Sequence, residues 1–238
     1  MELSKISTKD LLSEIERREK CESMPRKNII LLGPPGSGKG TQSIKLLNDF
    51  CYCQLSTGDL LRENVAKKTP AGIKAKEAMD KGQLVSDQLV NEILLNAIQS
   101  PSCERGIIFD GYPRNTEQAQ NLERLLEQQG KHLDKVIELK VDEEKLVDRI
   151  EGRRIHPASG RTYHIRNNPP KVEGLDDVTG EPLIHRDDDK KEVLKSRLDV
   201  YNQKTAPISN FYGQKGMLKT IDSMQPISTV YQNIKQSL

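Results

Sequence analysis

The sequence Gly33-Pro34-Pro35-Gly36-Ser37-Gly38-Lys39-Gly40-Thr41 lies between an apolar run, Asn28–Leu32, and a helical pattern of Ile44, Leu46, Leu47 and Phe50. Strand, glycine-rich loop and helix in this order predict a cradle for phosphates. Glycines let backbone N–H groups turn inward, the helix points its positive end at them, and Lys39 adds a full charge. The spacing fits G-x-x-x-x-G-K, but Gly40 stands where Ser or Thr is usual and Thr41 follows, which leaves the metal-facing hydroxyl open. The motif predicts binding of a nucleoside polyphosphate.

The composition is that of a polar and nearly neutral chain, with 238 residues, 37 Lys and Arg, 35 Asp and Glu, and 34% hydrophobic residues. This length allows one large domain or one core with inserted subdomains. The balanced charge gives no indication of a nucleic-acid or membrane partner. No apolar run approaches the roughly 20 residues of a membrane span, and no secretory h-region is present. We therefore expect an intracellular protein, in the cytoplasm rather than the mitochondrial intermembrane space.

Strands and helices alternate along most of the chain. After the first strand and the phosphate loop, strands are predicted at 52–55, 105–110, 135–139 and 218–221, and helices at 116–129, 143–153 and 226–236. Residues 62–82, interrupted by Pro70 and Gly72, predict two short helices, and Ser86-Asp87 can cap a third. The alternation predicts a three-layer α/β/α fold with a five-stranded parallel sheet and ligands at the carboxyl ends of its strands.

Two segments depart from this alternation. Residues 155–186 are rich in Pro, Gly, Asp and His without helical periodicity, so we expect a small antiparallel insert built on hairpins, followed by one long helix over 188–211.

The second segment, residues 1–25, precedes the first core strand. Their near-helical apolar spacing, with Ser7 or Thr8 as a cap, predicts a helix on the core surface or a frayed tail, and a partner-docking helix is the alternative; the apolar positions are Leu3, Ile6, Leu11, Leu12 and Ile15.

Five arginines lie in different loops that should reach one edge of the sheet: Arg62, Arg114, Arg153, Arg186 and Arg197. Transfer of a phosphoryl group between two nucleotides requires fixed cations that hold several negative charges together. Arginine suits this task because its planar fork binds phosphate oxygens at two points and stays charged. Asp110, which ends a strand beside the phosphate loop, is the natural acid to organise Mg²⁺, directly or through water.

Three motifs resemble those of the adenylate kinases and occur in that family's order: Leu32–Thr41, Ser56-Thr57-Gly58-Asp59, and Ile108-Phe109-Asp110-Gly111-Tyr112-Pro113-Arg114 followed by Gln118. The sequence is similar to the long-lid type of these nucleoside monophosphate kinases from about residue 27 to its end. The resemblance implies a monomer that catalyses ATP + AMP ⇌ 2 ADP with Mg²⁺. The nearest alternative is a GTP:AMP phosphotransferase; pyrimidine and guanylate kinases are less favoured. A nucleotide-sensing module without catalysis is the alternative of another class.

The resemblance also assigns roles to individual residues. It implies that the donor nucleotide is held by Gly36, Ser37, Gly38, Lys39, Gly40, Thr41, Arg149, Arg153, Thr162, Tyr163 and Gln225. It implies that AMP is held by Thr57, Arg62, Gln83, Leu84, Val85, Gly111, Tyr112, Pro113, Arg114, Gln118, Arg186 and Arg197. The implied catalytic residues are Lys39, Arg114, Arg153, Arg186 and Arg197. Gln118 suits adenine because an amide can donate and accept along one edge of a base.

The implied domain organisation is a core of residues 26–55, 86–151 and 190–238, an AMP-side helical flap of 56–85, a lid of 152–189 and an N-terminal extension of 1–25. Zinc-bearing lids of the family carry four cysteines. The matching positions here are His156, Ser159, Asp176 and Thr179, with Asp177 as a neighbour. They resemble the hydrogen-bonded replacement seen in other members, so we expect no structural zinc, because hydroxyls are poor zinc ligands.

The four cysteines, Cys21, Cys51, Cys53 and Cys103, are too few and too irregular for a disulfide framework or a four-ligand zinc site. We expect buried, reduced thiols, since free cysteine packs as a small apolar residue. The family topology implies that the strands beginning near Cys53 and Cys103 are adjacent and parallel. Such neighbours would lie about 5 Å apart. We therefore expect proximity of this pair without a bond.

Overall fold

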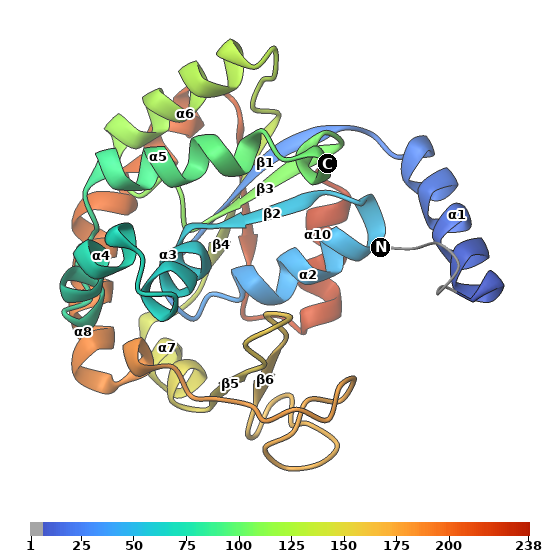
Figure 1. Ribbon diagram of the computed structural model, residues 1–238. Coiled ribbons are helices and arrows are strands. Elements are labelled where there is room, and N and C mark those ends of the chain that lie inside the picture. Colours follow the sequence, from blue (N-terminus) through green and yellow to red (C-terminus); the bar gives the residue numbers. More distant parts are fainter. Residues whose placement is uncertain (1–6) are drawn as a thin grey trace.

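The computed structural model describes residues 7–238 and contains a five-stranded sheet between two helical layers (Figure 1). The sheet has the order β2-β3-β1-β4-β7, and every neighbouring pair is parallel. Its strands are β1 (Lys27–Leu32), β2 (Cys53–Ser56), β3 (Gly106–Asp110), β4 (Lys135–Lys140) and β7 (Leu218–Asp222). This confirms the predicted three-layer fold and its five-stranded parallel sheet.

Alternate residues of each central strand face opposite helical layers. Ile30 and Phe109 pack in one apolar cluster, whereas Ile29 and Ile108 pack in the other. The first cluster is closed by α5 (Asp87–Ile98), α6 (Thr116–Gln128) and α9 (Pro207–Gln214), and the second by α2 (Lys39–Phe50) and α10 (Ile227–Lys235) (Figure 1). Because both faces are covered, the middle of the central strands is apolar, as in Ile29–Leu32 of β1 and Ile107–Phe109 of β3. Among residues 7–238, no helix has the length and apolar character needed to cross a bilayer.

The flap consists of the two short helices that the sequence predicts, α3 (Thr57–Ala66) and α4 (Pro70–Asp80). Thr69 caps α4, since its Oγ1 accepts from the N–H of Gly72 at 3.0 Å. The helices touch at this glycine: a Cβ added to Gly72 would lie 2.1 Å from the carbonyl oxygen of Asn64. Only glycine lets the two backbones approach this closely.

The insert is antiparallel, as predicted, with β5 (Arg153–Ile155) paired to β6 (Thr162–His164). The helix expected over 143–153 is shorter, because α7 spans Glu143–Glu151 and ends at Gly152. The chain turns into the hairpin at Gly152. The imidazole of His164 packs against this residue, and a Cβ there would lie only 2.3 Å from it. Arg153 and Arg154 therefore belong to β5. The predicted domain boundaries stay predictions.

Hydrogen bonds join the four lid positions that match the family's zinc ligands. His156 Nδ1 lies 2.8 Å from Ser159 Oγ, and Thr179 Oγ1 donates to Asp176 at 3.0 Å. The residues that complete the network were not predicted: Arg161 donates to the Asp176 carboxylate, and Glu181 Oε2 lies 2.6 Å from His156 Nε2. The expectation that the lid binds no zinc stays a prediction, which elemental analysis of protein purified without added metal would check.

The helix expected over 188–211 is found only in part, because it begins at Lys191 and a π turn interrupts it. The chain forms α8 (Lys191–Val200), a π turn (Tyr201–Thr205) and α9. Pro207 has no N–H to donate to the preceding turn, and the N–H of Ala206 donates instead to the carbonyl of Tyr201, five residues back, at 2.9 Å. The π turn brings Thr205 to the loop after β3, where its hydroxyl donates to the carbonyl of Arg114 at 2.8 Å.

The N-terminal extension forms a helix, α1 (Thr8–Ser23), which stands apart from the body of the molecule (Figure 1). Ser7 caps it by accepting from the N–H of Asp10 at 3.1 Å. Its apolar residues are not packed: the exposed fraction is 56% for Leu12 and 51% for Ile15. The helix meets the core only at its C-terminal end, where Cys21 is buried. Two positions of the predicted pattern, Leu3 and Ile6, lie outside the described residues.

The prediction of reduced cysteines is wrong, because two disulfides are present. Cys53 and Cys103 lie close together, as expected, with their Cα atoms 4.9 Å apart, but they are bonded. Cys103 ends a short 3₁₀ turn (Pro101–Cys103) that precedes β3, which places it beside the start of β2. The second bridge joins Cys21 of α1 to Cys51, the residue that follows α2, across a Cα separation of 5.6 Å.

The Gly72→Ala substitution should destabilise the protein by about 1–3 kcal/mol, because a methyl group has no room against the backbone of α3. The free energy of unfolding from urea titrations measures this. Gly213→Ala in α9 is the matched control: its added Cβ meets nothing closer than 3.9 Å, and alanine favours a helix by about 0.5–1 kcal/mol over glycine. Equal stabilities for the two variants would contradict the close approach of α3 and α4.

Candidate active site

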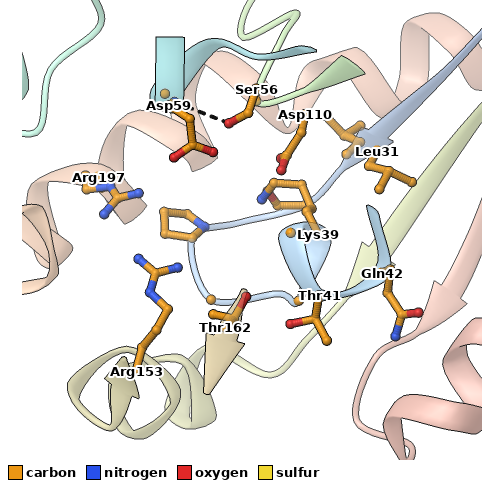
Figure 2. Close-up of a pocket in the computed structure, with 18 of the residues that line it drawn as sticks. Leu31, Lys39, Thr41, Gln42, Ser56, Asp59, Asp110, Arg153, Thr162 and Arg197 are labelled. Atoms are coloured by element: carbon orange, nitrogen blue, oxygen red, sulfur yellow. Dashed lines mark hydrogen bonds between the residues drawn. The ribbon is translucent and has the colours of Figure 1, made fainter. Parts of the chain in front are cut away.

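A cavity of about 1060 Å³ lies at the carboxyl ends of the strands, where core, flap and lid meet. It collects almost every residue that the sequence proposed. The exception is Ser37, a residue of the phosphate loop that is fully buried. Residues of the loop, the flap and the lid approach one another in this space, including Lys39, Asp59, Arg153 and Arg197 (Figure 2).

The phosphate loop leaves the first turn of α2 open to a ligand. Gly38 precedes that helix with a φ of 96°, in the left-handed region, and no side chain caps the helix N-terminus. The N–H groups of the first turn therefore have no side-chain partner, which makes them an anion site. Gly33, at the other end of the loop, passes the backbone of β4 so closely that a Cβ would lie 2.8 Å from the carbonyl oxygen of Leu139.

Lys39 folds back over the loop, and its ammonium donates to the carbonyls of Gly33 at 2.7 Å and Pro34 at 3.0 Å. Burial lowers the pKa of Lys39 to about 8, although the nearby Asp110 carboxylate raises it. The side chain is therefore held where phosphates would lie, with a proton that is less firmly bound than on an exposed lysine.

Asp110 ends β3 and faces the loop, with its Oδ2 3.9 Å from the position of a Cβ on Gly40. Gln54 of β2, which was not predicted, donates to Oδ2 at 3.1 Å. Burial raises the pKa of Asp110, while Lys39 acts in the opposite sense. A buried carboxylate beside the phosphate cradle fits Mg²⁺ held through water, because Mg²⁺ prefers oxygen ligands and retains part of its hydration shell.

The acceptor side is built on the loop after β3. Arg114 is anchored there, since its Nε donates to the carbonyl of Gly111 at 2.7 Å. Thr57 at the start of α3 donates to the same carbonyl at 2.8 Å, which ties the flap to this loop. Burial, together with the neighbouring Arg197 and Arg62, lowers the pKa of Arg114 to about 10. The guanidinium is thus a desolvated cation among other cations.

Three acids to which the sequence analysis gave no role hold four of the five predicted arginines. Oδ1 of Asp59 accepts from Arg62 at 2.7 Å and from Arg186 at 2.6 Å, so one oxygen joins the flap to the end of the lid. Burial raises the pKa of Asp59, but these two arginines outweigh it and bring the pKa to about 2. The remaining pairs join Asp188 to Arg62 and Arg197, and Asp189 to Arg153 and Arg197.

The donor side lies between α7, the loop after β7 and the lid. Arg149 is fixed by its Nη2, which donates to the carbonyl of Ser223 at 2.8 Å. Ser223, another residue that was not predicted, donates its hydroxyl to the carbonyl of Ser37 and so joins this loop to the phosphate cradle. Gln225 lines the cavity here, and Thr162 faces it from β6 (Figure 2). The hydroxyl of Tyr163 is engaged within the lid, where it donates to Asp176 at 2.9 Å.

Gln118 lies at the start of α6, on the wall of the cavity, and is only 3% exposed. Both ends of its amide are engaged by the protein. The N–H of Arg114 donates to Oε1 at 2.7 Å, and Nε2 donates to Asp87 at 2.5 Å. Gln83, Leu84 and Val85 also line the cavity, and their contact with AMP stays a prediction.

Comparisons with known proteins agree with this geometry. The family model "Adenylate kinase" matches residues 31–217. "Adenylate kinase 4" of Oryza sativa subsp. japonica is 50% identical over 236 residues, which cover 99% of this chain and 97% of that protein. "Adenylate kinase 4" of Arabidopsis thaliana is 48% identical, covering 100% and 96%. "Adenylate kinase" of Kluyveromyces lactis is 50% identical over 211 residues, covering 88% and 93%. The chain belongs to the adenylate kinase family, the phosphotransferases that act on nucleoside monophosphates.

Proposed function

We propose that the protein catalyses the reversible, Mg²⁺-dependent transfer of a phosphoryl group in ATP + AMP ⇌ 2 ADP. The observation that carries this proposal is the convergence on one cavity of Lys39 and the five arginines that the sequence placed at one edge of the sheet. A site that holds a single nucleotide needs fewer cations. Five guanidinium groups between a phosphate loop and a second, flap-lined compartment suit two phosphate chains that meet end to end.

The residues divide the work by position. The open N-terminus of α2 and Lys39 would bind the donor phosphates, while Arg114 and Arg62 would bind the phosphate of AMP. Arg153, Arg186 and Arg197 lie between the two sides and would neutralise the charge on the group in transit. Mg²⁺ held near Asp110 would supply further positive charge at the donor phosphates. Residues 56–85 and 152–189 would close over the nucleotides and exclude water, which competes with AMP as the acceptor.

The acid partners of the arginines fit this proposal. Without nucleotides, Asp59, Asp188 and Asp189 balance cations that would otherwise repel one another. A bound phosphate can then accept from the guanidinium N–H groups that these carboxylates leave unused, or replace a carboxylate. In both cases the cations already lie near their working positions, which reduces the reorganisation that binding requires.

A coupled assay of ADP formation tests the proposal, with ATP or GTP as donor and AMP, CMP, UMP or GMP as acceptor. We expect the highest kcat/KM for ATP with AMP. A preference for GTP above about tenfold would make the protein a GTP:AMP phosphotransferase instead. A folded protein that binds ATP but forms no ADP with any pair would support the nucleotide-sensing alternative.

ATP binding should weaken as Lys39 loses its proton. With a pKa of about 8, the protonated fraction falls from roughly nine-tenths at pH 7 to one-tenth at pH 9, so the Kd for ATP alone should rise about tenfold. Titration calorimetry at the two pH values measures this. Lys39→Arg is the matched control, because a guanidinium does not titrate in this range. A wild-type Kd that is the same at both pH values would contradict the role of Lys39.

Arg114→Ala should impair the acceptor side selectively. We expect kcat/KM for AMP to fall by at least about 100-fold, because the variant loses a desolvated cation aimed at the AMP phosphate. The Kd for ATP should change by less than about threefold. Calorimetry with each nucleotide checks the split, and thermal unfolding shows whether the variant stays folded. Equal weakening of ATP and AMP would remove Arg114 from the acceptor side.

A further inference from the structure

The amide of Gln118 can adopt only one of its two orientations. The atom that faces the N–H of Arg114 at 2.7 Å must be an acceptor, because a backbone N–H only donates. The atom that faces Asp87 at 2.5 Å must be a donor, because an ionised carboxylate only accepts. Oε1 and Nε2 are therefore assigned by their partners, and a rotation of the amide by 180° would lose both hydrogen bonds.

Asp87 is itself fixed. It is the first residue of α5, at the point where the flap returns to the core, and Asn115 Nδ2 lies 3.2 Å from its Oδ2. The Oδ1 of the same asparagine caps α6 by accepting from the backbone N–H of Gln118 at 2.7 Å. Asp87, Asn115 and Gln118 thus form a closed set of hydrogen bonds across the starts of two helices.

After these bonds, the amide retains one N–H on Nε2 and one lone pair on Oε1. A 6-aminopurine offers a donor at its 6-amino group and an acceptor at N1. A 6-oxopurine offers the reverse, an acceptor at O6 and a donor at N1. An amide that cannot rotate can pair with only one of these two patterns. With the other base, donor would face donor and acceptor would face acceptor, and these buried groups would be left without hydrogen bonds.

We propose that Asp87 is a specificity-determining positioning residue, which fixes the orientation of Gln118 and so makes the acceptor site select a 6-aminopurine 5′-monophosphate over a 6-oxopurine one. This inference rests on the proposed function, in which Gln118 lies along the base of AMP. Asp87 acts through Gln118 and does not need to contact the nucleotide. Asp87 therefore determines, from the start of α5, which purine base the acceptor site binds.

The test compares AMP with inosine 5′-monophosphate, which differs from AMP at positions 6 and 1 of the base, with ATP as the donor. We expect the wild-type protein to prefer AMP by at least about 100-fold in kcat/KM. Asp87→Asn keeps the shape of the side chain, but its own amide can donate to Gln118 or accept from it, so only the N–H of Arg114 still favours one orientation of Gln118. The ratio of kcat/KM for AMP to that for inosine 5′-monophosphate should then fall at least about tenfold. The KM for ATP should not change.

Glu144→Gln is the matched control, because it also removes a negative charge from the first turn of a helix, α7, away from the cavity lining. It should leave the ratio unchanged. If Asp87→Asn fails to fold, Asp87→Ser replaces it, since a hydroxyl can also donate or accept. A ratio within about threefold of wild type in the folded variant would overturn the role of Asp87 but leave the proposed function standing. A wild-type protein that uses neither acceptor would overturn the proposed function and this inference together.

Discussion

The arrangement of this protein depends on mutual repulsion among the cations that surround one cavity. Arg62, Arg114, Arg186 and Arg197 are partly buried, and each lies within the field of at least one of the others. Such a group is stable only if carboxylates are placed between its members. Asp59, Asp188 and Asp189 provide this, so the acids are as necessary to the site as the arginines are.

These ion pairs also connect parts of the chain that are remote in sequence. Asp59 follows β2, whereas Arg186 lies at the end of the insert, and one carboxylate oxygen holds them together. Asp188 and Asp189 form a 3₁₀ turn (Asp187–Asp189) just before α8, so their backbone position is set by the core helix. Charged contacts therefore join the flap, the lid and the core, and phosphates can compete for the same partners.

Much of the fold and the site could be predicted from the sequence, because both follow local rules. The alternation of apolar runs with helical patterns indicated the parallel sheet, and the loop ending in Lys39 indicated its ligand. What could not be predicted depends on contacts between distant residues: Asp59 meets Arg186 across 127 positions, and Asp87 meets Gln118 across 31. The run Asp187-Asp188-Asp189 beside Arg186 was a usable signal, and so was Pro207, which marks the break in the helix. The bonded cysteines had no local signal beyond their spacing.

The π turn between α8 and α9 amounts to a one-residue insertion that the helix has absorbed. Each residue of an α-helix turns the chain by about 100°. Deletion of one residue from Tyr201–Thr205 would therefore leave a continuous helix but rotate everything after it by about a quarter of a turn or more. Ile208 and Tyr212 would leave the apolar cluster they now share with α6, and Thr205 would turn away from Arg114. In this segment the number of residues therefore matters more than their identity. Many substitutions would keep the direction of α9, whereas a deletion or insertion of one residue would change it.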